Sequence, residues 1–449
     1  MKRSEFLRLA GLGLMYPLVK SLSSFQSPGN TSKKVIIVGA GMAGISAGRA
    51  LTDMGIPCII LEARDRIGGR VFSDSSLGTT LDFGASWIHE KKGNPILALA
   101  NKYKIETRDT NYDSISAWHY KGEKIAEEQL YRIYKKSQKL LRRAIRINGR
   151  KDYDPPFSEG LTRALQEMAY QGRELEEILW RISTEELNAA VEFEMLSGWG
   201  DKEKGYGGGD SLFPGGYHQV INQLSIKLNI KTGSPVYEIV QNNQGVSVKT
   251  QEKTYEGSHC LVTVPLGVLK AGKINFIPAL SQRKKDAIAG LQMGNLNKIG
   301  LKMEKVSWPS DKHFLGYVSE KKGNFPVFLN WAQYTGKPFL IAFAGYKLSE
   351  KLDTLNESQI RSEISKPLEL LAGKNTIEAL KYSAWKKDPL AFGSYSVLPP
   401  GISGKKFDDL SISEGKIHFA GEATIRGQNG TVHGAYLSGI REAEKLKKL

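Results

Sequence analysis

A glycine-rich turn near the start of the chain constrains the fold more than any other feature. The β-branched run Lys33–Val38 leads directly into the sequence GAGMAG, and Ile45–Met54 then has the apolar spacing of a helix. In this context Gly39 supplies a tight turn, Gly41 lets the backbone approach a pyrophosphate, and Gly44 permits close contact between helix and strand. Unpaired amides at the start of the helix attract phosphate. The pattern therefore predicts a βαβ unit that binds a dinucleotide.

A carboxylate stands where such a unit needs one. Cys58–Leu61 is the second predicted strand, and Glu62 follows it directly. A carboxylate at this position accepts hydrogen bonds from both ribose hydroxyl groups of a dinucleotide. Without that context, an exposed glutamate with no ligand is the expectation. The strand, turn and helix favour the binding role, but they do not distinguish NAD from FAD.

Composition places the chain among globular proteins and excludes several functional classes. The 449 residues are 40% hydrophobic and 24% charged, which suits two or three domains with a large core. No apolar run reaches the roughly 18 residues that span a bilayer. The net charge of +16 comes without a basic, aromatic-interleaved motif, so we expect a solvated basic surface and no nucleic-acid partner. Cys58 and Cys260 lie in apolar runs and the histidines lack ligand spacing, so no disulfide or metal site is expected.

The first thirty residues have the character of a targeting segment. Basic residues precede the apolar stretch Ala10–Val19, which has the length of a signal-peptide core. The sequence RSEFLR resembles a twin-arginine export signal in which Ser4 replaces the second arginine, and Ser21–Ser23 is a weak cleavage site. Residues 1–30 therefore predict either export to the periplasm through a degenerate signal or a tail retained in the cytoplasm.

The order of predicted elements indicates an α/β protein with two domains. A mainly helical stretch runs from Asn94 to about Gly198, with Lys124–Ile147 and Glu159–Met195 as its periodic parts, and later segments alternate between strands and helices. This order predicts a Rossmann-type domain assembled from discontinuous segments, with a second domain inserted twice. We expect the cofactor-binding domain at 31–92, 203–269 and 385–449. The inserted domain, with a mixed sheet and helices, is expected at 93–202 and 270–384.

The residues after the second strand carry a family resemblance. Glu62–Arg70 (EARDRIGGR) resembles the FAD signature of the flavin-containing amine oxidase superfamily. Further blocks of that superfamily follow in the same order: Asp82–His89 (DFGASWIH), Leu212–Tyr217 (LFPGGY), Val264–Leu269 (VPLGVL), Gly294–Lys298 (GNLNK), Gly421–Thr424 (GEAT) and Asn429–Gly439 (NGTVHGAYLSG). Polyamine oxidases are the most similar branch, and lysine-specific histone demethylases come next.

The resemblance implies FAD and a set of residues that bind it. Arg70 serves the pyrophosphate side, Val236 the adenine end and Glu422 the ribityl chain, and further cofactor positions are Gly84, Ala85, Ser86, Trp87, Trp385 and Val432. The last helix, from about Thr431, aims its first amides at the flavin pyrimidine ring, where reduction places negative charge. Monoamine oxidases attach the flavin to a cysteine at the position of Ser394, so we predict FAD held non-covalently.

The same resemblance assigns the catalytic and substrate positions. Lys298 matches a lysine that holds a water against flavin N5; taken alone it is a surface charge. Tyr395 forms an aromatic wall over the flavin, and Thr431 stands where some members have a second tyrosine. His89 either hydrogen-bonds a distal amine or is structural. Glu192 and Phe193 resemble a pair that lines the polyamine tunnel; the alternative is one exposed glutamate beside one core aromatic residue.

The resemblance therefore implies an enzyme that oxidises polyamines at a carbon next to nitrogen. Hydride passes to flavin N5, O2 is reduced to H2O2, and no metal takes part. Because only a neutral amine assists C–H cleavage, activity is expected to rise from neutral to mildly alkaline pH. Alternatives are an L-amino acid or monoamine oxidase of the same superfamily and a chromatin-type demethylase or binding protein. A basic protein repels polyamines at long range, so Glu192 and Glu194 are candidates for an acidic mouth.

Overall fold

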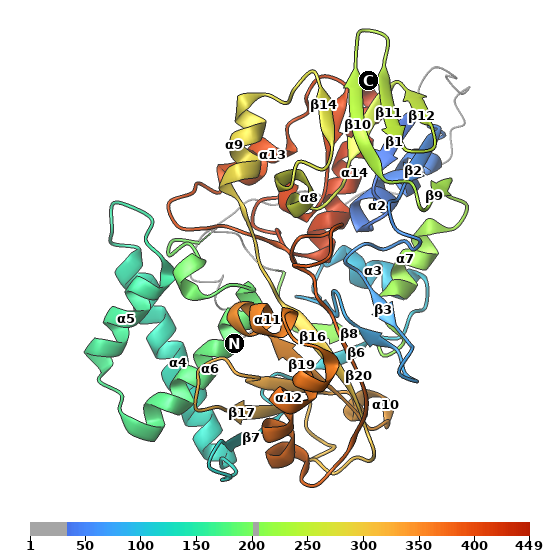
Figure 1. The fold of residues 1–449 in the computed structure, drawn as a ribbon. Helices are drawn as coiled ribbons and strands as arrows, with labels where there is room; N and C mark the ends of the chain where they lie inside the picture. The colour runs from blue at the N-terminus through green and yellow to red at the C-terminus, as the bar shows by residue number, and fades with distance from the viewer. Residues whose placement is uncertain (1–33, 201–205) are drawn as a thin grey trace.

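The computed structural model of the chain describes residues 34–200 and 206–449, and its elements form an upper and a lower part (Figure 1). The upper part is built on a five-stranded sheet of order β22-β13-β1-β2-β9, in which all neighbouring strands are parallel. Its strands are β1 (Val35–Val38), β2 (Cys58–Leu61), β9 (Ile230–Lys231), β13 (His259–Val262) and β22 (Ile417–Phe419). The strand β1, sequence VIIV, is wholly buried, as expected of a parallel strand covered on both faces.

Two helices pack closely against each other beside this sheet. The first, α2 (Met42–Asp53), follows the glycine turn and contacts β1 and β2, and the last, α14 (Val432–Lys448), packs against α2. Small residues permit the approach: a Cβ at Gly439 would lie 2.2 Å from the carbonyl oxygen of Ala43. The hydroxyl of Ser46 donates to the carbonyl of Tyr436 across 3.0 Å. The end of the chain is thereby fixed against its first βα unit.

A second sheet of the upper part has the order β12-β11-β10-β14. Its strands are β10 (Val236–Gln241), β11 (Val246–Thr250), β12 (Thr254–Gly257) and β14 (Asn275–Ile277). The parallel pairing of β14 with β10 ties residues 275–277 to the upper part. The helices α8 (Leu266–Lys270), α9 (Gln282–Gly290) and α13 (Lys405–Ser411) lie nearby (Figure 1).

The lower part contains a mixed six-stranded sheet of order β20-β16-β19-β18-β17-β7. Only β17 and β7 pair in parallel. The strands are β7 (Ile115–His119), β16 (Asn297–Met303), β17 (Phe314–Val318), β18 (Val327–Asn330), β19 (Phe339–Ala344) and β20 (Ile377–Tyr382). The accompanying helices are α10 (Ala332–Thr335), α11 (Tyr346–Asp353) and α12 (Glu357–Ala372).

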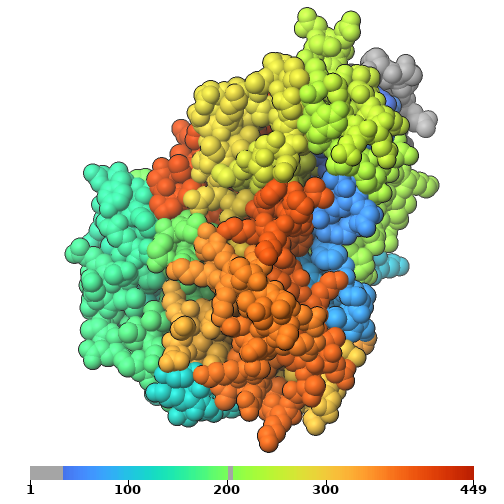
Figure 2. Space-filling view, viewed as in Figure 1, coloured from blue at the N-terminus to red at the C-terminus, as the bar shows by residue number. Residues whose placement is uncertain are grey.

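Helices flank this sheet on the left of Figure 1 and form the teal side of the surface in Figure 2. They are α4 (Glu127–Asn148), α5 (Phe157–Met168) and α6 (Gly172–Ala189), followed by the 3-10 helix η1 (Phe193–Met195). The apolar pattern of Glu159–Met195 is thus split into three helices. Ala169 and Ala190 end the two longer ones with left-handed φ values of 51° and 57°.

The remaining described elements are short. A three-stranded antiparallel sheet has the order β5-β8-β6, and two-stranded sheets pair β3 with β4 and β15 with β21. The remaining bounds are β3 (Ser73–Asp74), β4 (Leu81–Asp82), β5 (Trp87–Ile88), β6 (Arg108–Thr110), β8 (Asp210–Leu212), β15 (Gln292–Met293), β21 (Ser396–Val397), α3 (Pro95–Lys102), α7 (His218–Ser225) and η2 (Glu422–Thr424). Among residues 34–200 and 206–449, no helix combines the length and apolar character that a membrane crossing needs. The predicted targeting segment 1–30 lies outside the described residues.

Candidate active site

A large cavity opens at the carboxyl ends of the parallel strands. Its volume is about 1030 Å³. Its lining includes Gly39 after β1, Glu62 after β2, Thr263 after β13 and Gly421 beyond β22. Open parallel sheets bind their ligands at this edge. From here the cavity extends to the helical wall, a surface formed by Leu130, Tyr131 and Tyr134 of α4 with Trp180, Thr184 and Asn188 of α6.

The three predicted glycines of the first turn have different surroundings. Gly39 has a φ of 106°, which favours glycine. A Cβ at Gly41 would meet no protein atom within 4 Å, because it would project into the cavity that this residue lines. A Cβ at Gly44 would lie 1.9 Å from the carbonyl oxygen of Gly39, and this residue does not line the cavity. Gly41 therefore leaves room for a ligand at the start of α2, whereas Gly44 serves the turn itself.

The carboxylate of Glu62 holds the turn and faces the cavity. Its Oε2 accepts the amide of Ala40 across 2.7 Å, and its Oε1 accepts the amide of Arg64 across 2.9 Å. Each oxygen of a carboxylate has a second lone pair, which remains available to hydroxyl donors of a ligand. The side chain is otherwise buried. Its position is therefore fixed before any ligand binds.

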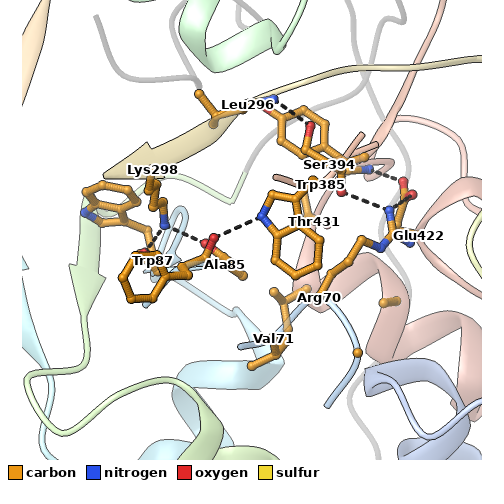
Figure 3. Close-up of a pocket in the computed structure, with 18 of the residues that line it drawn as sticks. Arg70, Val71, Ala85, Trp87, Leu296, Lys298, Trp385, Ser394, Glu422 and Thr431 are labelled. Atoms are coloured by element: carbon orange, nitrogen blue, oxygen red, sulfur yellow. Dashed lines mark hydrogen bonds and ion pairs between the residues drawn. The ribbon is translucent and has the colours of Figure 1, made fainter. Parts of the chain in front are cut away.

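An ion pair joins the first and last segments beside the cavity (Figure 3). Arg70 donates from Nη1 to Oε1 of Glu422 across 2.8 Å and to the carbonyl of Ser394 across 3.0 Å. Glu422 also accepts the hydroxyl of Ser396 and, across 2.8 Å, the amide of Gly430. Arg70, Ser394 and Glu422 all line the cavity. The pair thus fixes two walls that lie far apart in the sequence.

The start of α14 presents a helix N-terminus to the cavity. Thr431 is its N-cap: the hydroxyl accepts the amide of Gly434 across 2.9 Å and donates to the carbonyl of Gln428 across 2.6 Å. Thr431 and Val432 line the cavity. Both hydrogen-bonding functions of the threonine hydroxyl are used within the helix cap. The positive end of the helix dipole favours negative charge at this wall.

Lys298 is buried in β16 with its ammonium group at the cavity (Figure 3). Nζ donates to the carbonyl of Asp82 across 3.0 Å, to the carbonyl of Gly84 and to the hydroxyl of Ser86. Burial lowers the pKa of Lys298 to about 8, against the opposing charge of Asp82. Burial likewise raises the pKa of Asp82 to about 6. Burial thus makes Lys298 give up its proton more readily than an exposed lysine does.

Aromatic side chains surround this amine. Nζ lies 5.6 Å from the centroid of the Trp87 ring and 5.9 Å from that of Phe343. Trp385, which lines the cavity nearby, donates from Nε1 to the carbonyl of Phe83 across 3.0 Å. Tyr395 lines the cavity as well, and its hydroxyl donates to the carbonyl of Asn188 across 2.9 Å. Trp385 and Tyr395 are thus held by hydrogen bonds at their polar atoms, and both side chains line the cavity.

The structure brings most of the predicted site residues to one cavity. Besides those above, the lining includes Gly84, Ala85, Ser86, His89 and Val236. The pair Glu192 and Phe193 is placed elsewhere. Phe193 is 2% exposed and packs against Phe157 in the core of the helical flank, and Glu192 pairs with Lys347 across 2.6 Å. Neither side chain lines the cavity, unlike the other substrate positions that the resemblance implies.

The helical wall and the partners of His89 were not predicted from the sequence. Tyr131 and Tyr134 lie three residues apart in the predicted helix Lys124–Ile147, a spacing that puts both on one face. That spacing is a usable signal, although it is equally typical of a core face. No comparable signal marks Asp210, which becomes a neighbour of His89 only through the pairing of β8 with β5.

The sequence model of one protein family covers nearly the whole chain. The model described as flavin containing amine oxidoreductase matches residues 42–447. The chain belongs to this family. It is an amine oxidoreductase that uses a flavin, as the blocks of the sequence analysis imply.

Individual relatives agree with this assignment. Polyamine oxidase 4 of Oryza sativa subsp. japonica is 31% identical over 92% of this chain and 88% of its own length. Polyamine oxidase 2 of Arabidopsis thaliana is 32% identical over 93% of this chain and 88% of its own length. Lysine-specific histone demethylase 1 homolog 1 of Arabidopsis thaliana is 32% identical over 96% of this chain but 54% of its own length. A redesigned putrescine oxidase superposes with a TM-score of 0.75 at 18% identity, covering 93% of this chain and 99% of its own, which shows the fold.

The residues of this amine oxidoreductase suit a flavin dinucleotide. A Cβ at Gly41 would enter open space at the start of α2, where the helix N-terminus favours an anion such as phosphate. Glu62 offers carboxylate lone pairs at the end of β2, and the starts of α2 and α14 offer two positive helix ends to one cavity. The cavity volume of 1030 Å³ lies at the upper limit of the about 300–1,000 Å³ typical of small-molecule sites. It suits a large cofactor together with a substrate.

Proposed function

We propose that this amine oxidoreductase oxidises polyamines at a carbon next to nitrogen, with non-covalently held FAD and with O2 as the electron acceptor. The observation that carries the proposal is the continuity of one cavity from the glycine turn at Gly41 to the tyrosines of the helical wall. A long, narrow amine fits such a space better than a compact one. The plant relatives named polyamine oxidases support the same substrate class.

The cofactor would lie along the parallel strands. The amides at Gly41 and the start of α2 would hold its pyrophosphate, Glu62 its ribose and Val236 its adenine end. Arg70, Glu422 and Trp385 would contact the remainder, with Val432 and the positive end of α14 next to the pyrimidine ring. Bound FAD supplies the acceptor for the two electrons removed from the substrate carbon. Ser394 offers no thiol for a covalent link, and its hydroxyl instead accepts the amide of Leu296 across 3.1 Å.

Lys298 would bind and release a proton at the reacting end of the cavity. As an ammonium ion it uses its three N–H bonds on Asp82, Gly84 and Ser86. Loss of a proton, with a pKa of about 8, leaves a lone pair at Nζ that accepts a hydrogen bond from a water in the cavity. We therefore expect Lys298→Met to lower turnover while leaving flavin content unchanged, as an absorbance spectrum and a peroxide assay would show.

The substrate would lie between the aromatic rings and the helical wall. Tyr395 and Trp87 would orient the chain next to Lys298, with Thr431 widening the opposite wall. His89 would meet a nitrogen distant from the reacting carbon. The reacting nitrogen must be neutral to assist C–H cleavage, so the rate of flavin reduction is expected to rise from neutral to mildly alkaline pH.

A peroxide-release assay on the purified yellow protein tests this proposal. The panel contains spermine, spermidine, acetylated polyamines, 1,4-diaminobutane, benzylamine and amino acids, and flavin bleaching under anaerobic conditions is followed in parallel. Oxidation of the polyamines at rates well above benzylamine and the amino acids is the expected result. Acid precipitation should release the flavin, identified as FAD, into the supernatant. A preference for amino acids, or a flavin that stays oxidised with every amine, would overturn the proposal.

A further inference from the structure

A buried carboxylate holds one of the cavity-lining side chains. Asp210 in β8 is 5% exposed and does not line the cavity. Its Oδ2 lies 2.8 Å from Nδ1 of His89 and accepts the hydroxyl of Tyr112 across 2.8 Å. Its Oδ1 accepts the amide of Glu90 across 2.8 Å. His89 and Tyr112 both line the cavity, so Asp210 connects two of its walls from behind.

The protonation of this cluster follows from the charge of Asp210. Burial alone would raise the pKa of Asp210, but the charge and hydrogen bond of His89, with the amide of Glu90 and the hydroxyl of Tyr112, lower it to about 2. An ionised carboxylate only accepts hydrogen bonds. Nδ1 of His89 must therefore carry a proton. Only the neutral imidazole has a lone pair at Nε2, since the charged ring that lowers the pKa of Asp210 carries a second proton there. The neutral ring is the form that accepts a hydrogen bond, and within residues 34–200 and 206–449 no protein group hydrogen-bonds to its Nε2.

The imidazole is fixed on its other sides as well. The ring of Trp87 stacks on it, with 6.3 Å between centroids and 26° between planes. The side-chain amide of Asn94 donates to the carbonyl of His89 across 2.7 Å. The next residue, Glu90, has a left-handed φ of 57° that its amide contact to Asp210 stabilises. Ring orientation and tautomer are thus both determined by protein contacts.

We propose that Asp210 is a positioning residue for substrate binding: it fixes His89 so that Nε2 accepts a hydrogen bond from a substrate ammonium group distant from the oxidised carbon. This inference rests on the proposed function and deepens it. The ligand is a primary or secondary ammonium carried on an alkyl chain, and the ionised Asp210 behind the imidazole strengthens the attraction. Tyr112 supports the same arrangement, since its hydroxyl donates to Asp210 and its ring stacks on Phe314 at 5.4 Å.

The variant Asp210→Asn tests the inference, and Asp109→Asn is its matched control. Asp109 in β6 pairs in register with Ser211 of β8, and its carboxylate contacts Lys91 and Ser211 instead of His89. The probes are spermidine and its two analogues that each lack one terminal nitrogen, N-butyl-1,3-diaminopropane and N-propyl-1,4-diaminobutane. Dissociation constants come from competition with spermidine oxidation and from changes in flavin absorbance.

We expect Asp210→Asn to raise the dissociation constants of spermidine, and of the analogue that keeps the nitrogen facing His89, by roughly tenfold. This is the effect of losing one charge-assisted hydrogen bond. The analogue without the nitrogen that meets His89 should change by less than about twofold, and kcat at saturation should be retained. Asp109→Asn should leave the dissociation constants of all three probes unchanged. An equal loss for all three probes, or no loss for any, would overturn the inference.

A measurement without turnover keeps the test independent of the proposed function. Long-range ¹H–¹⁵N spectra of the histidine-labelled enzyme, with His89 assigned through His89→Gln, report which ring nitrogen carries the proton. Wild-type enzyme should show Nδ1 protonated and Nε2 not, and Asp210→Asn should mix the tautomers. Protonation at Nε2 alone in the wild type would refute the role of Asp210. If spermidine were not oxidised at all, the proposed substrate would fail while these spectra still decided the role of Asp210.

Discussion

Arg70 and Glu422 lie 352 positions apart, and the arginine Nη1 donates to the glutamate Oε1 across 2.8 Å at the wall of the cavity. Their side chains are 22% and 7% exposed, so the pair is shielded from solvent. Glu422 accepts further hydrogen bonds from Ser396 and Gly430. The pair therefore links the segment after β2 to the segment before α14, and both segments line the cavity.

Glu422→Gln should release this link. The amide retains a weaker hydrogen bond to Arg70 but leaves its charge uncompensated, so we expect a loss of about 2 kcal/mol in unfolding free energy. Flavin affinity should fall at least roughly tenfold, because both walls of the cavity depend on the pair. Denaturation and flavin titration measure the two effects. As a control, Glu357→Gln removes a pair with Arg361 on a glutamate side chain that is 60% exposed, and should change stability by less than about 0.5 kcal/mol.

Two alanine substitutions in the glycine turn should separate cofactor binding from folding. In Gly44→Ala the new Cβ lies 1.9 Å from the carbonyl of Gly39, so the turn must shift and unfolding free energy should fall by about 3 kcal/mol. In Gly41→Ala the Cβ meets no protein atom, so stability of the flavin-free protein should change by less than about 1 kcal/mol. Its flavin affinity should fall roughly 100-fold because the methyl group enters the ligand space. Full flavin content in Gly41→Ala would contradict this assignment.

Local sequence patterns predicted the elements that carry the cofactor-side residues. The second predicted strand, Cys58–Leu61, has the expected bounds, because a short apolar run is a local property of the sequence. The glycine turn is equally local, since its strand, turn and helix are consecutive. The α/β fold is confirmed for the same reason.

Contacts between distant segments were not predictable in the same way. Asp210 lies 121 positions from His89 and reaches it only through a short antiparallel sheet whose strands have two or three residues. The expected helical stretch Glu159–Met195 extends past the end of α6 at Ala189, and the left-handed Ala190 changes the direction of the chain before Glu192 and Phe193. That turn points Phe193 into the core. A single left-handed residue is invisible to helical periodicity.

The buried amine of Lys298 should make stability rise with alkaline pH. Its native pKa is about 8, whereas the unfolded chain keeps the proton to about pH 10.4. Between these values the unfolded state binds more protons than the native state, so stability increases with pH. The unfolding free energy of the wild type relative to Lys298→Met should therefore gain about 2 kcal/mol from pH 7 to pH 10. Denaturant titrations of the holoprotein at both pH values measure the difference.

Asp82 should change the unfolding free energy with pH in the opposite direction, so it serves as the control. Burial raises its native pKa to about 6, so the native state holds a proton that the unfolded chain loses near pH 3.9. Its contribution to stability should thus fall as pH rises from about 4 to 6. Asp82→Asn should remove this fall in stability between about pH 4 and pH 6. The rise in stability at alkaline pH should remain. Parallel pH dependence of Lys298→Met and wild type would contradict the assigned titration of the lysine.

Two glutamates near the helical flank should differ in their effect on polyamine capture. Glu127, at the start of α4, lines the cavity and pairs with Lys312 across 2.6 Å, and Lys312 lines it too. Hydrogen bonding to Lys312 lowers the pKa of Glu127, which keeps the carboxylate ionised. Glu127→Gln leaves a cation at the cavity without its partner. The KM for spermidine should therefore rise roughly threefold at low salt, with kcat unchanged.

Glu192→Gln is the matched variant and should leave the KM for spermidine unchanged. Its carboxylate pairs with Lys347 outside the cavity lining, so its charge does not face the substrate. Added salt at about 0.5 M should erase the effect of Glu127→Gln, since screening at that ionic strength acts within a few ångströms. A larger rise in KM for Glu192→Gln than for Glu127→Gln would show that polyamines enter on the η1 side of the flank. Each variant removes one negative charge, so both change the net charge of this basic chain equally. A difference between their KM values therefore reports the position of the lost charge and not the total charge.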